Sequence, residues 1–180
     1  SFLITGGAGG LGSQIARTVA SQGGSVGILD TNEVAITELV SELKAGGVKS
    51  AGQVVDVRDS KSVTRAVDEL AKVLGSVDVL IAAAGGSLGT PRDLAEISDD
   101  DFDLVLDVNV KGTFNSVRAV IPHMKKVGGG SIVTFSSIGG RSASPVTGVP
   151  YATAKAAILG LTRRLAKEVG EFNIRVNAIA

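Results

Sequence analysis

Short apolar runs alternate along this chain with longer segments in which apolar residues recur every three or four positions. Runs of strand length between helical segments are typical of a parallel sheet covered by helices. The apolar runs predict strands at residues 2–5, 25–30, 51–57, 77–82, 131–135 and 174–178. The periodic segments predict helices near residues 12–22, 32–45, 60–74, 99–126 and 152–170. Because βαβ connections are right-handed, this alternation predicts a doubly wound, mostly parallel α/β fold.

The pattern predicts one domain with its binding site at one edge of the sheet. No linker or low-complexity segment interrupts it, so we expect residues 1–180 to form a single domain. The longest irregular stretches, 84–98 and 136–150, follow the fourth and fifth predicted strands. Since ligands of open α/β sheets bind at the carboxyl ends of the strands, we expect these stretches to flank the site.

Composition excludes several classes of function. The 180 residues are 44% hydrophobic but only 3% aromatic, which indicates a core of aliphatic side chains. Lys+Arg and Asp+Glu each number 18, so there is no basic field to attract nucleic acid or a membrane surface. With no cysteine and one histidine we expect no metal site, and a reducing compartment such as the cytoplasm is the expected location.

The first chemical motif is the glycine-rich stretch TGGAGGLG, which lies between the first predicted strand and the first predicted helix. Gly7, Gly9 and Gly12 fit the spacing G-x-G-x-x-G, whereas Gly6, Gly10 and Gly12 fit G-x-x-x-G-x-G. Bare backbone at a helix N-terminus lets a pyrophosphate approach the N–H groups and the positive end of the helix dipole. No Lys-Ser or Lys-Thr follows, which argues against a nucleoside triphosphate loop. A dinucleotide is the favoured ligand.

Asp30 indicates which dinucleotide. It ends the second predicted strand, where an acidic side chain accepts hydrogen bonds from the adenosine ribose hydroxyls. The same carboxylate would repel a 2′-phosphate, and neither Thr31 nor the glycine loop supplies a cation. These observations favour NAD over NADP. The structural alternative for Asp30 is a helix N-cap.

The candidate reacting group lies in the stretch YATAK. Tyr151 and Lys155 are four residues apart on a predicted helix, so both side chains project from one face. A free phenol has a pKa of about 10 and is a poor base at neutral pH, but a nearby ammonium group favours the phenolate. Such a pair can take a proton from an alcohol or return one to a carbonyl. By itself the spacing is also compatible with an unremarkable helix surface.

In its motifs the sequence resembles the short-chain dehydrogenase/reductase family over essentially its whole length. TGGAGGLG matches the cofactor motif of that family, DVNVKG the motif with the active-site asparagine, SIVTFSSIGG the serine strand and YATAK the Tyr-x-x-x-Lys motif. The motifs occur in the family's order and spacing. The resemblance implies a Rossmann fold with strand order 3-2-1-4-5-6 and a nicotinamide-dependent interconversion of a secondary alcohol and a ketone.

The resemblance also implies a catalytic group of four. Tyr151 would be the general acid/base, and Lys155 would hold the nicotinamide ribose and favour the phenolate. Asn109 would hold a water that links Lys155 to solvent, although it could also be an ordinary mid-helix amide. Ser137 would donate a hydrogen bond to the substrate oxygen, with Ser136 as its competitor at the end of the same strand.

The cofactor residues follow in the same way. Asp56 and Val57 resemble the adenine-contacting end of the third strand, although Asp56 could be only a turn or cap residue. His123, the only histidine, is expected to be a partly exposed helix residue. The cofactor-binding residues that the resemblance implies are Gly6, Gly10, Leu11, Gly12, Asp30, Asp56, Val57, Ala84, Gly85, Tyr151 and Lys155.

Two features depart from the family pattern. Where the family usually has Asn-Asn-Ala-Gly after the fourth strand, this chain has Ala-Ala-Ala-Gly at 82–85, which puts the rigidity of that segment in doubt. Family members also continue beyond the sixth strand with a substrate-covering segment and a seventh strand. We therefore expect a truncation after Ala180, and the substrate is not specified.

Alternatives of other classes remain. One is an isomerase or dehydratase that uses bound NAD without net turnover, and another is a non-catalytic dinucleotide-binding protein.

The helices expected at 99–126 and 152–170 carry apolar residues on more than one face, and family members commonly pair these helices across a two-fold axis. The resemblance therefore implies a homodimer or homotetramer.

Overall fold

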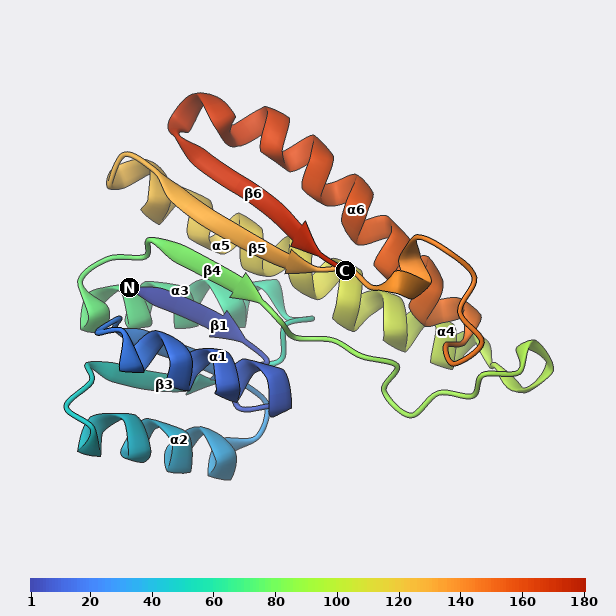
Figure 1. The fold of residues 1–180 in the computed structure, drawn as a ribbon, viewed down its shortest axis with the longest axis horizontal. Coiled ribbons are helices and arrows are strands. Elements are labelled where there is room, and N and C mark those ends of the chain that lie inside the picture. The colour runs from blue at the N-terminus through green and yellow to red at the C-terminus, as the bar shows by residue number, and fades with distance from the viewer.

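The computed structural model describes all 180 residues and contains a six-stranded sheet. Every pairing is parallel, and the strand order is β3-β2-β1-β4-β5-β6 (Figure 1). The strands are β1 (Phe2–Thr5), β2 (Val26–Asp30), β3 (Ser50–Val54), β4 (Val79–Ala82), β5 (Gly130–Phe135) and β6 (Ile174–Ile179). The fold class and the strand order are those predicted from the sequence.

Helices connect the strands on both faces of the sheet. They are α1 (Gly10–Ser21), α2 (Glu33–Ala45), α3 (Ser60–Leu74), α4 (Asp99–Leu106), α5 (Gly112–Lys126) and α6 (Val149–Val169). α1 and α2 pack on one face around Ile4, Ile28 and Ile81, whereas α3 and α5 pack on the other around Leu3, Leu80 and Ile132. Two aliphatic cores therefore sandwich the sheet. No helix combines the length and the apolar character that a membrane span requires.

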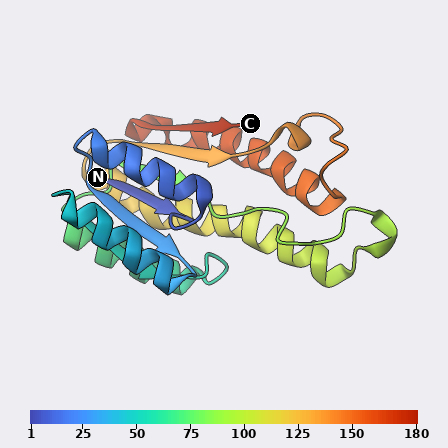
Figure 2. The same cartoon turned by 60° about the horizontal axis from the view of Figure 1, so that its bottom comes forward.

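The helix predicted at 99–126 is interrupted. Ser98 caps α4 in a capping box with Asp101, but residues Asp107–Lys111 form a π-helical turn before α5 begins. The three segments still follow one another as a single rod that extends beyond the sheet (Figure 2). A π-helical turn inserts one residue and is frequent at functional sites, and here it contains Asn109. The spacing of apolar residues did not predict the π-helical turn, because α4, the turn and α5 follow a common axis.

Two long loops project from the carboxyl ends of the strands. The segments 83–98 and 136–148 leave β4 and β5 at the arrowhead end of the sheet (Figure 1). They meet where Gly148 packs on Pro91, since a Cβ at Gly148 would lie 2.7 Å from the Pro91 carbonyl oxygen. These loops follow the strands that the sequence indicated. β1 and β4 are neighbours in the sheet. The chain continues from β1 to β2 on one side and from β4 to β5 on the other, so the ends of β1 and β4 form the switch point of the sheet.

Candidate active site

The glycine loop is shaped by close backbone contacts. Gly6 has a left-handed backbone with φ of 63°, and a Cβ there would lie 2.8 Å from the backbone of Ala84. A Cβ at Gly12 would collide with Gly6, because α1 crosses directly above the loop. Gly10, by contrast, has open space within 4 Å of its Cβ direction. Two glycines therefore permit packing, and the third keeps the helix N-terminus accessible.

α1 begins without a side-chain cap. Gly9 is its N-cap residue, and no side chain bonds the first N–H groups of the helix. Uncapped N–H groups and the positive end of the helix dipole together favour an anion at this position. The loop therefore meets the physical requirements of a phosphate site.

Asp30 lies at the end of β2, beside the glycine loop. Its Oδ2 accepts a hydrogen bond from the N–H of Ala8 at 3.0 Å, and its Oδ1 accepts from Thr31 and Asn32 at 2.8 and 3.1 Å. The N-cap of α2 is Asn32, so capping does not account for Asp30. The remaining capacity of Oδ2 is free for a ligand hydroxyl.

A cleft of about 460 Å³ runs along the carboxyl ends of β1, β2, β3 and β4. Its lining includes the predicted cofactor residues Gly6, Gly10, Leu11, Gly12, Asp30, Asp56, Val57, Ala84 and Gly85. Leu104 and Val108, on the rod formed by α4 and the π-helical turn, supply an apolar wall that the sequence did not predict. The cleft therefore brings together segments that are far apart in the chain.

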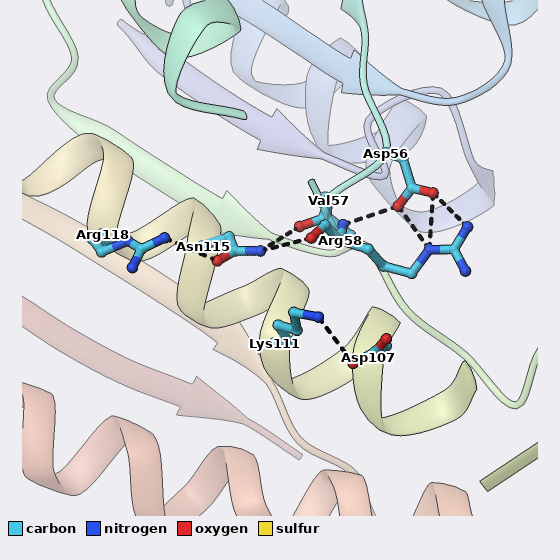
Figure 3. A network of polar contacts seen from close by, with 7 residues as sticks. All are labelled: Asp56, Val57, Arg58, Asp107, Lys111, Asn115 and Arg118. Carbon is cyan, nitrogen blue, oxygen red and sulfur yellow. Dashed lines mark hydrogen bonds and ion pairs between the residues drawn. The ribbon is translucent and has the colours of Figure 1, made fainter. Parts of the chain in front are cut away.

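Arg58 is the only cation in the lining of this cleft, and sequence reasoning missed it. Its guanidinium group bonds the Asp56 carboxylate through Nε and Nη2, with a shortest distance of 2.6 Å (Figure 3). These hydrogen bonds hold the pKa of the Asp56 carboxyl below its usual range. The spacing of the two residues in the stretch DVRD was the available signal, since an Asp and an Arg two residues apart in a turn can pair.

Tyr151 and Lys155 lie one turn apart at the start of α6. The Nζ of Lys155 is 5.4 Å from the centre of the Tyr151 ring and donates to the Phe135 carbonyl oxygen at 2.9 Å. A Cβ at Gly85 would be 3.5 Å from the same Nζ, so Lys155 lies close to a residue of the cleft lining, although neither Tyr151 nor Lys155 belongs to that lining. Burial lowers the pKa of Lys155 to about 8, because it penalises the charged form. A phenolate or ribose hydroxyls beside Lys155 would offset that penalty.

Asn109 is fully buried and connects the π-helical turn with the segment that follows β4. Its Oδ1 accepts from the N–H of Gly86 at 3.0 Å, while its Nδ2 donates to the carbonyl oxygens of Gly86 and Val105, each at 2.9 Å. Through Asn109, the π-helical turn therefore holds the backbone of Gly86, and the preceding residue, Gly85, lies close to the Nζ of Lys155.

The two competing serines have different surroundings. Ser136 is buried, and its hydroxyl donates to the Lys155 carbonyl oxygen at 2.8 Å. The Oγ of Ser137 accepts the N–H of Gly139 at 3.2 Å, which leaves its own hydroxyl hydrogen free. Ser136 thus has a structural partner, whereas Ser137 keeps a donor available.

The Ala-Ala-Ala-Gly segment is held by backbone contacts despite its lack of amide side chains. The N–H of Ala83 donates to the Thr5 carbonyl oxygen at 3.1 Å, and the N–H of Ala84 approaches the Thr5 hydroxyl at 3.4 Å. Asn109 then binds the backbone at Gly86.

His123 lies away from the cleft and contacts Asp68 on α3 at 2.8 Å, with its side chain 25% exposed.

Comparison with known proteins defines the class to which this fold and site belong. The family model described as short chain dehydrogenase matches residues 1–180, and the chain belongs to that family. The bovine (Bos taurus) dehydrogenase/reductase SDR family member 4 is 39% identical over 180 residues, which are 99% of this chain and 63% of that protein.

Solved structures of family members have the same fold. An NAD⁺-bound xylitol dehydrogenase superposes with a TM-score of 0.94 at 33% identity, covering 99% of this chain and 68% of that one. An actinorhodin polyketide ketoreductase with NADPH superposes with a TM-score of 0.91 at 31% identity, covering 98% and 67%. The chain therefore spans about two thirds of the length of these relatives.

Proposed function

We propose that this chain carries the catalytic site of an NAD(H)-dependent oxidoreductase that interconverts a secondary alcohol and a ketone. The observation that carries the proposal is the buried Lys155, which lies beside the Tyr151 ring and close to Gly85, a residue that lines the same cleft as the glycine loop. The match of the whole chain to the short chain dehydrogenase family supports the proposal. Bound NAD would accept a hydride from the alcohol carbon, or NADH would return it.

Three features of the cleft and its surroundings support a dinucleotide as the ligand. The uncapped start of α1 would hold the pyrophosphate, and Asp30 would accept a ribose hydroxyl. The nicotinamide end would then reach Gly85 and Lys155. Related structures hold either NAD⁺ or NADPH, so the choice of NAD rests on the carboxylate of Asp30.

The protein's own side chains would move the proton and position the substrate. Tyr151 would take the hydroxyl proton during oxidation and return it during reduction. Lys155 would favour the phenolate through its charge. The free hydroxyl hydrogen of Ser137 would bond the substrate oxygen where negative charge develops. Asn109 would hold a water that connects Lys155 to solvent.

A direct assay tests this function. The full-length protein is incubated with NAD or NADH and a panel of secondary alcohols or ketones, and NADH absorbance is followed. Turnover that depends on both the dinucleotide and the substrate supports the proposal. Binding of NAD with no absorbance change for any substrate of the panel would instead support a non-catalytic dinucleotide-binding protein.

We predict at least tenfold tighter binding of NAD than of NADP, a difference of about 1.4 kcal/mol. The reason is the Asp30 carboxylate, which would repel a 2′-phosphate, with Thr31 as its uncharged neighbour. Replacing Asp30→Ala together with Thr31→Arg should shift the preference toward NADP in a calorimetric titration. Asp30→Asn is the control, because it removes the charge but keeps an acceptor for the N–H of Ala8. Equal or tighter NADP binding by the unaltered protein would contradict the prediction.

We also predict that the full-length protein forms a dimer or a tetramer. Phe114 on α5 is 48% exposed with Arg118 over its ring, and Ala157 on α6 is exposed as well. A second copy would remove this apolar surface from water. Light scattering at micromolar concentration should give at least twice the protomer mass, and Phe114→Asp should lower it. Val34→Asp, on the exposed face of α2, should leave it unchanged. A monomeric unaltered protein would refute the prediction.

A further inference from the structure

The far end of the cleft has the shape and chemistry of a slot for the base of the dinucleotide. If the pyrophosphate lies at α1 and a ribose at Asp30, the attached base continues away from Gly85 along the cleft. The lining of the cleft includes the apolar residues Val57, Leu104 and Val108, together with Asp56 and Arg58. Apolar walls suit the faces of a purine, and the polar groups are left to contact its edge. This step rests on the proposed function.

The polar groups at this end match adenine. The Asp56 carboxylate is an acceptor, and the N–H of the next residue, Val57, has no hydrogen-bond partner within the chain. Adenine presents the complementary pair on its Watson–Crick edge, with the 6-amino group as donor and N1 as acceptor. Hypoxanthine presents the reverse, an acceptor oxygen at position 6 and a donor at N1. An open Asp56 would therefore discriminate strongly between the two bases.

The carboxylate of Asp56 is not open. Its Oδ1 accepts from the Arg58 N–H at 2.9 Å and from Nε at 3.0 Å, and its Oδ2 accepts from Nε at 2.8 Å and Nη2 at 2.6 Å. These contacts come from three N–H groups of Arg58, because the single hydrogen of Nε is shared between the two oxygens. Arg58 therefore takes up most of the about four acceptor positions of the carboxylate. The adenine amino group has to compete with the guanidinium for Asp56.

We propose that Arg58 is a specificity-determining residue that competes with the adenine 6-amino group for Asp56 and so weakens the pocket's selection of adenine over other purines. Every contact that blocks the carboxylate in Figure 3, apart from one backbone N–H, comes from this single side chain. Removing the guanidinium would free Oδ2 and leave Oδ1 with only the Arg58 backbone N–H, while the Val57 N–H would stay in place.

The backbone of this turn does not depend on the Arg58 side chain. Asn115 on α5 is buried, and its Nδ2 donates to the carbonyl oxygens of Val57 and Arg58 at 2.9 and 3.3 Å (Figure 3). The Arg58 side chain is 45% exposed and that of Asp56 38%, and ion pairs of this kind contribute little to stability. Arg58→Met should therefore keep the fold and the position of Asp56.

The test compares NAD with nicotinamide hypoxanthine dinucleotide, which differs from it only in the base. Calorimetry on the full-length protein gives the dissociation constant of the hypoxanthine dinucleotide divided by that of NAD. The contributions of the phosphates, the riboses and the nicotinamide cancel in this ratio. Arg58→Met should raise the preference for NAD by about threefold or more, the scale of one hydrogen bond. Arg58→Gln should change it in the same direction. Adding Asp56→Asn to Arg58→Met should remove the gain.

Arg17→Met is the matched control, because Arg17 forms a similar exposed pair with Glu42 on α2, outside the lining of the cleft. A ratio that rises only in the Arg58 variants supports the inference. NAD binding with an unchanged or lower ratio in both Arg58 variants would overturn the inference alone. Absence of NAD binding by the unaltered protein would overturn the proposed function and, with it, this inference.

Discussion

Replacing Tyr151 by Phe should lower turnover by about a thousandfold or more and leave the affinity for NAD nearly unchanged. The ring of Phe would pack where the ring of Tyr151 packs now, 5.4 Å from the Nζ of Lys155, so only the transferable proton is lost. Tyr151 is the only tyrosine in the chain, so no second phenol can take over its role.

The measurement pairs steady-state kinetics with calorimetric binding. Tyr151→Phe should reduce kcat without a matching change in the dissociation constant of NAD. Lys155→Met is the contrasting variant, since its ammonium group is proposed to serve both the phenol and the ribose. It should weaken NAD binding as well as turnover. A Tyr151→Phe protein that oxidises an accepted alcohol at a near-normal rate would end this assignment of the acid/base.

The sequence predicted the alternation of strands and helices because each strand is a short aliphatic run between helical segments, whereas the strand order was implied by the family resemblance. Leu3, Leu80 and Ile132 are completely buried in the centre of the sheet, as parallel strands with helices on both faces require. The glycine loop and Asp30 were placed together for a related reason. Their positions at strand ends follow from connectivity alone, once the strand order is given.

The details that the sequence did not predict depend on side-chain contacts between separate segments. The π-helical turn exists where the amide of Asn109 reaches back to Gly86, a contact with no periodic signature. Arg58 was overlooked because its relevance to the cleft depends on where the turn after β3 lies. The turn is fixed by Asn115, which is 57 residues away in the sequence. Such long-range contacts emerge only from the packed structure.

The second large expected effect is the fall in turnover when Ser137, but not Ser136, is replaced by Ala. The difference is expected because the two hydroxyl groups have different hydrogen-bond partners. Ser137→Ala should lower turnover by about a hundredfold or more, the scale for removing one donor to a developing oxyanion. Ser136→Ala should lose the hydrogen bond to the Lys155 carbonyl oxygen, costing about 1 kcal/mol of stability. Its turnover should change much less, because that hydroxyl is directed at the α6 backbone.

Kinetics and thermal unfolding of both variants separate the two roles. Ser137→Ala should combine a large fall in kcat with a nearly unchanged Tm, since its Oγ accepts only one N–H in the loop. Ser136→Ala should show a lowered Tm and a modest fall in kcat. If the kinetic loss follows Ser136 instead, the substrate oxygen must lie on the other side of the strand end. The hydrogen-bond role would then pass to the serine that now holds α6 against β5.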